Sequence, residues 1–345
     1  AKLWNYFFNY FPFPALKHKK LLTFAGKLHI NNFSCIMANV IKIKKGLDIN
    51  LKGKASDVLL NGGKSDSYAI VPDYYNGIVP KVVAKVGEKV KAGSVLMIDK
   101  NRPEIKFVSP VSGEVTAVNR GEKRKVLSVV VKPEAQIEYE DFGKKNVASL
   151  KREEVKEAIL HAGMWPFIKQ RPYDIVASPA DEPRDIFVSA FYSAPLAPNF
   201  DFVVKGQEVD FQTGLDALAK LTDGKVYVGI RKGSSVSVKG VETVEVEGPH
   251  PAANVGVQIN HIKPINKGEV VWTVNPADVI VIGRLFNKGI ADFSRLVVIT
   301  GSETTERGYV KAIAGCTIAS LVDGKIMRGN DDIRIISGNV LTGTK

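Results

Sequence analysis

Three histidines are the first candidates for chemistry in the body of this chain: His161, His250 and His261. Their spacing fits no metal-binding pattern such as H-x-x-x-H, and no cysteine lies near them. We expect His161 to cap the last turn of a helix, where a positive charge is favourable, and His261 to end a strand. His250 lies in Gly-Pro-His-Pro-Ala-Ala-Asn. This stretch predicts a rigid loop whose histidine is hydrogen-bonded, or a ligand or partner contact.

Nucleophiles and phosphate-binding loops are not recognisable either. The chain has two cysteines, Cys35 and Cys316, which excludes a disulfide scaffold, a four-thiolate zinc site and an iron–sulfur cluster held by this chain alone. No Ser-His-Asp or Cys-His order with convincing flanks is present. The glycine–serine turns at 63–65 and 233–235 lack the spacing of a Walker loop. The residues alone therefore predict no catalytic residue and no metal ligand.

The charge of the chain is concentrated at its beginning. Of 345 residues, 48 are Lys or Arg and 36 are Asp or Glu, a formal net charge of +12. Residues 1–36 hold five lysines, no acid and nine of the 29 aromatic residues. The remainder is only mildly basic, which weakens the case for a nucleic-acid partner. We expect residues 1–36 to be a non-native extension upstream of a start at Met37, rather than a targeting peptide or a membrane-surface anchor.

The elements that could position a site begin with a run of short strands. Residues 78–133 alternate β-rich runs with glycine turns, which predicts a small flattened barrel or sandwich. The order of the turn at 86–93, a strand, a hairpin at Asp99-Lys100 and a strand ending in SPVSGEV resembles the biotin/lipoyl-carrier fold, the barrel-sandwich hybrid. In that family the hairpin lysine carries the swinging arm. The hairpin here is about two residues longer, so we expect a structural module and no modification of Lys100.

The rest of the chain alternates helices and strands, and then ends in a different pattern. An amphipathic helix is predicted at 151–162, followed by an α/β domain. Its expected strands are 173–178, 186–193, 225–230, 270–274 and 278–283, with a helix at 210–221. A hairpin (295–301 and 308–315), a short helix (317–323) and a strand (333–338) follow. This order resembles the soluble-ligand-binding β-grasp (SLBB) fold.

The three modules in this order resemble the NqrA family, one of the subunits of the Na⁺-translocating NADH:quinone reductase. The stretches that carry the resemblance are IKIKKGLDINLKG (41–53), GPHPAANVGVQINHI (248–262) and VVWTVNPADVIVIGRLFNKG (270–289). The expected domains are 37–140, barrel-sandwich; 141–293, α/β; and 294–345, SLBB-like β-grasp. We expect the family's Cys-containing C-terminal region to be missing from this chain. The RnfC family of the Rnf electron-transfer complex has a similar module order. It carries two cysteine-rich cluster motifs and a glycine-rich flavin loop, both missing here.

The resemblance implies an α+β multi-domain protein whose α/β domain is related to the flavin- and NADH-binding subunit of complex I. The place of the glycine-rich loop in that relative reads GMWPFIKQRPY (163–173) here. Proline removes a backbone donor and only one glycine remains, so an FMN or dinucleotide site is not expected. The resemblance instead implies that FMN, FAD and the iron centre belong to partner subunits, and that this chain binds no cofactor of its own.

The resemblance also implies a function. The chain would be a peripheral subunit on the cytoplasmic face of the bacterial inner membrane, reaching the membrane through partner subunits. Its complex would couple NADH oxidation and ubiquinone reduction to Na⁺ export. A quinone would need an apolar cleft with a few polar groups. We place that cleft between the α/β and β-grasp modules, near Trp165, Phe167, His250 and Trp272. The alternative is a non-catalytic scaffold or ligand-binding adaptor.

Overall fold

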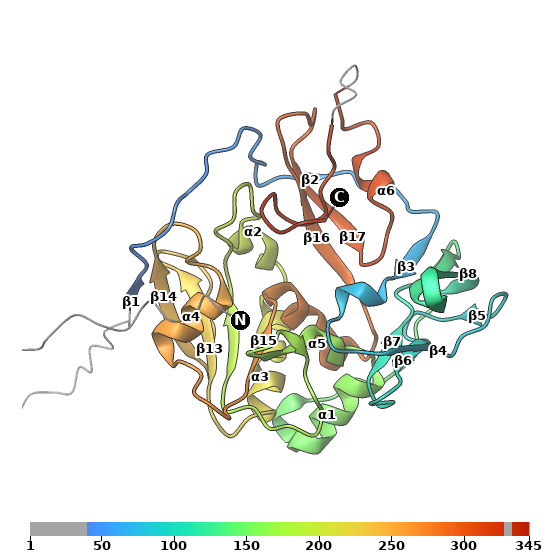
Figure 1. Cartoon of the computed structure of the whole chain (residues 1–345), viewed down its shortest axis with the longest axis horizontal. Coiled ribbons are helices and arrows are strands. Elements are labelled where there is room, and N and C mark those ends of the chain that lie inside the picture. Colours follow the sequence, from blue (N-terminus) through green and yellow to red (C-terminus); the bar gives the residue numbers. More distant parts are fainter. Residues whose placement is uncertain (1–39, 328–332, 345) are drawn as a thin grey trace, which may run out of the picture. The chain divides into compact units, whose positions relative to one another are not determined.

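The structure, a computed structural model, describes residues 40–327 and 333–344 (Figure 1). The predictions for residues 1–36, and for Cys35, lie outside the described residues. The boundaries expected between the three domains stay predictions. Strands of different expected domains pair with one another, as β1 (Val40–Lys42) does with β14 (Glu242–Glu247) and β2 (Leu59–Leu60) with β17 (Gly308–Ile313).

Two small sheets form the predicted barrel-sandwich. One has the order β3-β9-β8-β5 and the other β4-β6-β7. Their core is built from small aliphatic side chains such as Val115, Val129 and Val131, all fully buried. The strands are β3 (Tyr68–Ile70), β4 (Pro80–Val82), β5 (Lys89–Val90), β6 (Val95–Asp99), β7 (Lys106–Val108), β8 (Gly113–Arg120) and β9 (Val126–Pro133).

The hairpin between β6 and β7 is confirmed, and it is fastened to the rest of the protein. Asp99 is fully buried and accepts hydrogen bonds from the backbone N–H groups of Val79 and Asn101. Arg102 Nε lies 2.8 Å from Asp99 Oδ2. The Arg102 guanidinium also donates to the carbonyl oxygen of Val176 at 3.1 Å, on the seven-stranded sheet. Lys100 is exposed. The tip therefore serves as a contact between modules.

A seven-stranded sheet forms the α/β part, in the order β1-β14-β13-β12-β15-β10-β11. Neighbouring strands from β1 to β15 in this order are parallel, β10 is antiparallel to β15, and β11 is antiparallel to β10. Their bounds are β1 (Val40–Lys42), β10 (Ile168–Arg171), β11 (Ile175–Val176), β12 (Ile186–Ser189), β13 (Val226–Arg231), β14 (Glu242–Glu247) and β15 (Val271–Val274).

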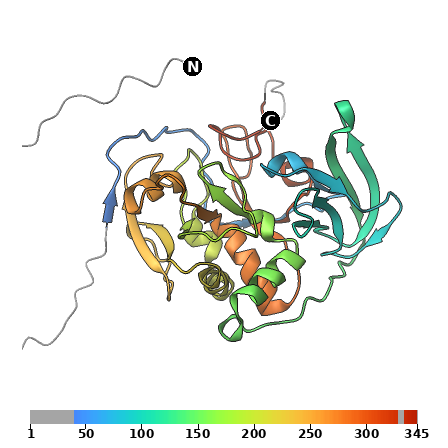
Figure 2. The same cartoon turned by 60° about the horizontal axis from the view of Figure 1, so that its bottom comes forward.

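Successive side chains of each strand point to opposite faces of this sheet. Both faces therefore carry apolar side chains, and helices cover both. Ile186 and Val188 of β12 pack into the large core with α1 (Arg152–His161), α3 (Glu208–Lys220) and α5 (Pro276–Lys288), which lie together in Figure 2. Phe187 points to the other face, against Ile259 of α4 (Val255–Ile262). A short helix, α2 (Phe200–Val204), follows β12.

Two sequence predictions in this part are wrong. The expected strand at 278–283 is the middle of helix α5. The run is apolar because α5 is buried on all sides, from Val279 to Phe286, and a short apolar run does not distinguish a buried helix from a strand. His261 does not end a strand but lies in the last turn of α4, where its Nδ1 lies 2.8 Å from the carbonyl oxygen of Val257.

The last module is a three-stranded sheet with a short helix. Strands β16 (Ser294–Ile299) and β17 (Gly308–Ile313) form the predicted antiparallel hairpin, and α6 (Ile318–Val322) confirms the short helix. The strand predicted at 333–338 is wrong. Residues 333–336 have no regular structure, and Ser337 makes an isolated bridge with Thr344.

The segment after β1 links all three modules. β1 pairs with β14 at the edge of the seven-stranded sheet, and β2 (Leu59–Leu60) pairs with β17. In Figure 1 this blue segment runs from β1 across to β2 and β3. Only Val40–Lys42 of this segment lies in the large sheet, since the chain then leaves it. A hydrogen bond fixes this segment to the β-grasp module at Gly53, whose carbonyl oxygen accepts from the backbone N–H of Gly301 at 2.9 Å.

Candidate functional site

The strand order of the large sheet reverses between β12 and β15. From β12 the chain moves to β13 and β14 on one side, and then returns through α4 to β15 on the other side. Open α/β sheets bind ligands at the carboxyl ends of strands beside such a reversal. The residues at those ends are Ser189 of β12 and Val274 of β15. This edge is therefore the first place to look for a site.

A pocket of about 560 Å³ opens at this edge. Ser189 and Val274 form part of its lining, with Asn275 at the start of α5. The barrel-sandwich contributes Ile70, Tyr75 and Phe107, and the β-grasp module contributes Arg295, Ala314 and Gly315. All three modules thus meet at one cavity, whose volume is ordinary for a small-molecule site.

Aromatic rings form two walls of the pocket. Tyr75 and Phe107 pack edge to face, with 4.9 Å between ring centroids. Phe167 ends the short 3₁₀ turn Trp165–Phe167 and packs against Phe293 at 6.0 Å. Such offset and edge-on arrangements are the favourable ones for aromatic pairs. They leave the lining largely apolar and suited to a flat, unsaturated ring.

Five charged side chains line the same pocket: Lys169, Arg171, Asp174, Asp278 and Arg295. Arg295 Nη2 lies 3.1 Å from Asp278 Oδ1, and Lys169 comes from β10. The Asp278 side chain is 15% exposed and that of Arg295 26% exposed. Burial raises the pKa of Asp278 above its ordinary value, and the positive charges of Arg295 and Lys169 only partly offset it. Burial likewise lowers the pKa of Lys169, against the opposing pull of Asp174 and Asp278.

These charges are incompletely paired. In the described part of the chain, Asp278 Oδ1 and Arg295 Nε are buried without a hydrogen-bond partner, although the two side chains form an ion pair. Among the described residues, no carboxylate lies within ion-pair distance of the Lys169 ammonium, which sits over the ring of Tyr75, 5.5 Å from its centroid. Burying polar groups unpaired is costly. A ligand that donates and accepts hydrogen bonds would satisfy these groups.

Tyrosine hydroxyls complete the polar lining. Tyr192 donates from Oη to Asn275 Oδ1 at 3.2 Å, and burial raises its pKa above the ordinary value. Burial also raises the pKa of Tyr75, to about 12. Asn275 Oδ1 accepts in addition from the backbone N–H of Ala277, which caps α5. Both phenols therefore stay protonated and can act as neutral hydrogen-bond donors.

The structure places the four residues expected at a quinone cleft differently. Phe167 lines the pocket. Trp165 and Trp272 are fully or almost fully buried in the core of the sheet, with edge-to-face rings 5.4 Å apart, and Trp165 Nε1 donates to the carbonyl oxygen of Ala177 at 2.8 Å. His250 is not part of the lining. Its Nδ1 lies 3.0 Å from Ser193 Oγ, in the loop before α4.

Sequence reasoning misses Lys169, Asp278, Arg295 and Tyr192. Asp278 lies in the run mistaken for a strand, although Asn275 and Pro276 before it are a helix-start signal that places it in the first turn of α5. Lys169 lies on β10, within a stretch whose sequence gives no strand signal. No local pattern marks Arg295 or Tyr192, which reach the pocket only through the packing of modules distant in sequence.

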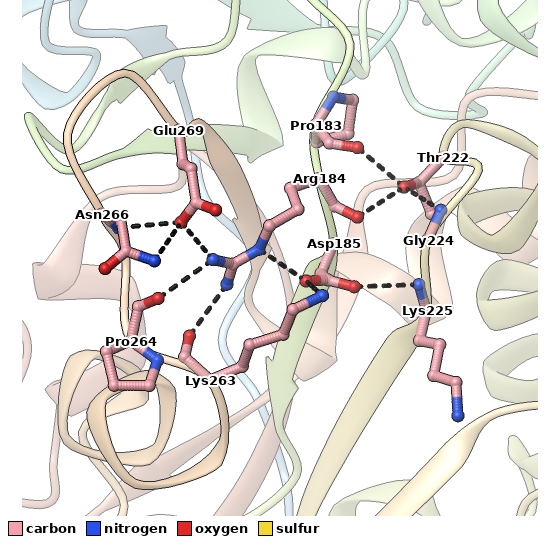
Figure 3. Close-up of polar contacts among 10 residues, drawn as sticks. All are labelled: Pro183, Arg184, Asp185, Thr222, Gly224, Lys225, Lys263, Pro264, Asn266 and Glu269. Atoms are coloured by element: carbon pink, nitrogen blue, oxygen red, sulfur yellow. Dashed lines mark hydrogen bonds and ion pairs between the residues drawn. The ribbon is translucent and has the colours of Figure 1, made fainter.

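A second polar cluster lies at the opposite, amino-terminal edge of the sheet (Figure 3). Asp185, which precedes β12, is fully buried and pairs with Arg184 Nε at 2.8 Å and Lys263 Nζ at 2.7 Å. Arg184 also pairs with Glu269 and donates to the carbonyl oxygen of Pro264. Every charged group of this cluster has a partner, so we interpret it as a structural clasp. We call it the amino-edge clasp.

Two features of the described residues bear on the site. Residues 40–327 and 333–344 hold no group of three or more His, Cys, Asp or Glu side chains placed to bind a metal ion. Within the same part of the chain, no helix combines the length and the apolar character that a membrane crossing requires.

Three models of NqrA domains match successive parts of the chain. The NqrA N-terminal barrel-sandwich hybrid domain matches residues 41–134, the NqrA second alpha/beta domain residues 150–291, and the NQRA C-terminal domain residues 296–345. The barrel-sandwich prediction is thereby confirmed, and the terminal module corresponds to the SLBB-type domain of this family. Together the models cover most of the described residues.

Similar proteins carry one name, that of the NqrA subunit of the Na⁺-translocating NADH-quinone reductase. The chain is 37% identical over 311 residues to this subunit from Vibrio atlanticus (strain LGP32), covering 89% of this chain and 69% of that protein. It is 36% identical over 309 residues to the same subunit from Neisseria meningitidis serogroup A, covering 88% and 69%. A solved NAD⁺-reducing [NiFe]-hydrogenase aligns over 44% of this chain and 34% of that chain with a TM-score of 0.33 and 13% identity, too weak a likeness to carry an argument. The chain therefore belongs to the NqrA family of Na⁺-translocating NADH-quinone reductase subunits.

Proposed function

We propose that this chain acts as a peripheral subunit of a Na⁺-translocating NADH-quinone reductase and that its pocket receives the headgroup of ubiquinone. Its relatives are named as subunits of that enzyme. In this proposal FMN, FAD and the iron centre belong to partner subunits, which also hold the chain at the cytoplasmic face of the bacterial inner membrane. No nucleic acid is involved. The chain would contribute a binding site to the reaction and no catalytic residue of its own.

The proposal extends to the domains themselves. We propose that they span 37–140, 141–293 and 294–345, and that the middle one is related to the flavin- and NADH-binding subunit of complex I. What supports that relation is the parallel order from β1 to β15, with the pocket at its carboxyl edge. A bound nucleotide is not part of the proposal, because Trp165, Pro166 and Phe167 occupy the place where a glycine-rich loop would approach phosphates.

The observation that carries quinone binding is the combination of aromatic walls and partly unpaired polar groups in one cavity. A quinone has a flat ring and carbonyl oxygens that only accept hydrogen bonds. Phe167 and Tyr75 offer faces and edges to such a ring. Lys169 and Arg295 offer donors to its oxygens. The pocket therefore matches the ring and its polar ends at the same time.

The test is a titration of the purified chain with ubiquinone-1, followed by tryptophan fluorescence and by calorimetry. Trp165 and Trp272 lie in the core beside the pocket-lining residues Phe167 and Thr273 and serve as reporters. We expect saturable binding at one site. Phe167→Ala should weaken it about tenfold, since losing a buried aromatic contact costs roughly 1–2 kcal/mol. Tyr173→Ala removes an aromatic ring that is 79% exposed and should leave binding unchanged.

A negative result would favour the other candidate function. If a well-folded chain bound no ubiquinone-1 up to the solubility limit, the chain would be a scaffold or adaptor, and the quinone site would belong to another subunit. Equal losses in the Phe167 and Tyr173 variants would also place binding outside this pocket.

A further inference from the structure

Asp278 occupies an unusual position in the pocket. It lies in the first turn of α5, and its Oδ1 lies 3.1 Å from Arg295 Nη2, yet in the described part of the chain this buried oxygen accepts no hydrogen bond. The ion pair with Arg295 holds the carboxyl group at the cavity wall. The carboxyl group is thus held at the pocket lining by an ion pair whose geometry leaves its hydrogen-bonding capacity unused.

The two redox states of a quinone need opposite partners at their oxygens. The oxidised ring has carbonyl oxygens, which accept hydrogen bonds. The reduced ring, the quinol, has hydroxyl groups, which can also donate. A protonated carboxyl group donates to a carbonyl, whereas a carboxylate only accepts. A carboxylate next to a carbonyl oxygen is therefore repelled, and a carboxylate next to a quinol hydroxyl forms a charge-assisted hydrogen bond.

We propose that Asp278 sets which redox state of the quinone this pocket prefers: protonated, it donates to the oxidised headgroup, and ionised, it accepts from the quinol. This inference rests on the proposed quinone site and concerns its selectivity. Lys169 and Arg295 carry hydrogen-bond donors that suit the oxygens of either form, so they supply affinity. Asp278 supplies the discrimination, because its role reverses with its charge.

The pH dependence follows from the groups that surround the carboxyl group. They line the same pocket and are Arg295 of β16, Lys169 and Arg171 of β10, Asp174 of the turn after β10 (which pairs with Arg171), Tyr75 of the segment after the first 3₁₀ turn (Pro72–Tyr74), and Tyr192 of the segment after β12. Burial raises the pKa of Asp278 above its ordinary value, and the positive charges of Arg295 and Lys169 oppose this shift. The tyrosines remain neutral. A rise in pH therefore ionises Asp278 and shifts the preference of the pocket from quinone to quinol.

The experiment compares ubiquinone-1 with ubiquinol-1, bound anaerobically to the full chain between about pH 5 and about pH 9. For the unmodified chain we expect Kd of quinone divided by Kd of quinol to rise about tenfold, as one hydrogen bond exchanges donor for acceptor. Asp278→Asn should flatten this profile, because an amide does not ionise. Asp278→Glu should restore a slope. The matched control is Asp174→Asn, which changes another aspartate of the pocket lining whose side chain is 49% exposed and should keep the slope.

The possible outcomes distinguish the role of Asp278 from the proposed quinone site on which it rests. Binding of both forms with a ratio that does not change with pH would overturn the role of Asp278 and leave the quinone site standing. A slope that survives in Asp278→Asn would overturn it as well. Absence of binding for both forms would overturn the quinone site and the inference together. A flat profile in the unmodified chain overturns the inference even where a variant fails to fold.

Discussion

Replacing Asp185 by Asn should destabilise the protein strongly, although the change is isosteric. Asp185 is fully buried in the amino-edge clasp. Its carboxylate accepts from the backbone N–H of Lys225 at 3.1 Å, from Arg184 Nε at 2.8 Å and from Lys263 Nζ at 2.7 Å (Figure 3). Asparagine has one side-chain oxygen: if it accepts from Lys225, the N–H₂ group faces the two cations, and if it faces the cations, it is uncharged and Lys225 loses its acceptor.

The magnitude follows from the exposure of each partner. A hydrogen bond to a charged group contributes about 1.5–3 kcal/mol. The Arg184 side chain is 17% exposed, so that contact is worth the middle of this range, while Lys263, 46% exposed, adds less than about 1 kcal/mol. Arg184 keeps Glu269 and two backbone carbonyl oxygens as partners, which limits the loss. We expect the free energy of unfolding to fall by about 3 kcal/mol at neutral pH.

Urea denaturation monitored by circular dichroism measures this change, and pH supplies a second check. Burial raises the pKa of Asp185, but the hydrogen bonds from Lys263, Lys225 and Arg184 outweigh it and hold the pKa below 3.8. A lowered folded-state pKa stabilises the fold above 3.8, and this stabilisation is lost as the pH falls through the folded-state value. The gap between the two proteins should therefore be constant near neutrality and close only in acid.

The control is Asp223→Asn. Asp223 also pairs with an arginine, Arg152, but its side chain is 86% exposed, and the expected loss is below about 1 kcal/mol. Equal losses at Asp185 and Asp223, or a gap that widens in acid, would refute the reasoning that burial gives the clasp its strength.

Two other predictions use matched pairs of variants. Gly214→Ala on α3 should lower the free energy of unfolding by about 2 kcal/mol, because the new Cβ would lie 2.1 Å from the carbonyl oxygen of Val279 on α5. Gly256→Ala on α4, where a Cβ meets nothing within 4 Å, should instead raise it by roughly 0.5–1 kcal/mol through helix propensity. Urea midpoints of the two variants that move in the same direction would contradict this account. Arg102→Met should speed amide hydrogen exchange in residues 100–105, because the hairpin tip loses its hydrogen bonds to the carbonyl oxygens of Val176 and Gly77. The control Lys100→Ala should leave the exchange rates unchanged. Similar exchange rates in both variants would contradict the role of Arg102 in fastening the hairpin.

Much of the fold is predictable because the local signals are strong. The helix at 151–162 has apolar side chains on one face and Gly163, at φ +67°, directly after its end. The hairpin of β16 and β17 is two short β-branched runs separated by a glycine-containing turn. The error at 278–283 arises where the signals conflict: β-branched residues favour a strand, while Asn275 and Pro276 favour a helix start. Burial between α3 and the sheet decides the outcome.

The site is less predictable than the fold. The sequence predicts three aromatic residues and one histidine at a quinone cleft. Of these four residues only Phe167 lines the pocket. Trp165 and Trp272 instead fill the core, the more common fate of large apolar side chains. The polar groups of the pocket come from segments more than a hundred residues apart, such as Lys169 and Asp278. Their meeting depends on tertiary packing, which a single sequence without a contact map does not contain.

The short strands β1 and β2 have a consequence for how the protein unfolds. Residues 40–60 form one short segment, yet this segment pairs with β14 and with β17 and continues directly into the barrel-sandwich. No module can come apart without disturbing an edge that this segment provides or anchors. The modules, although recognisable one by one, should thus melt in a single cooperative transition. Cutting the chain at a module boundary should yield fragments with exposed strand edges that aggregate.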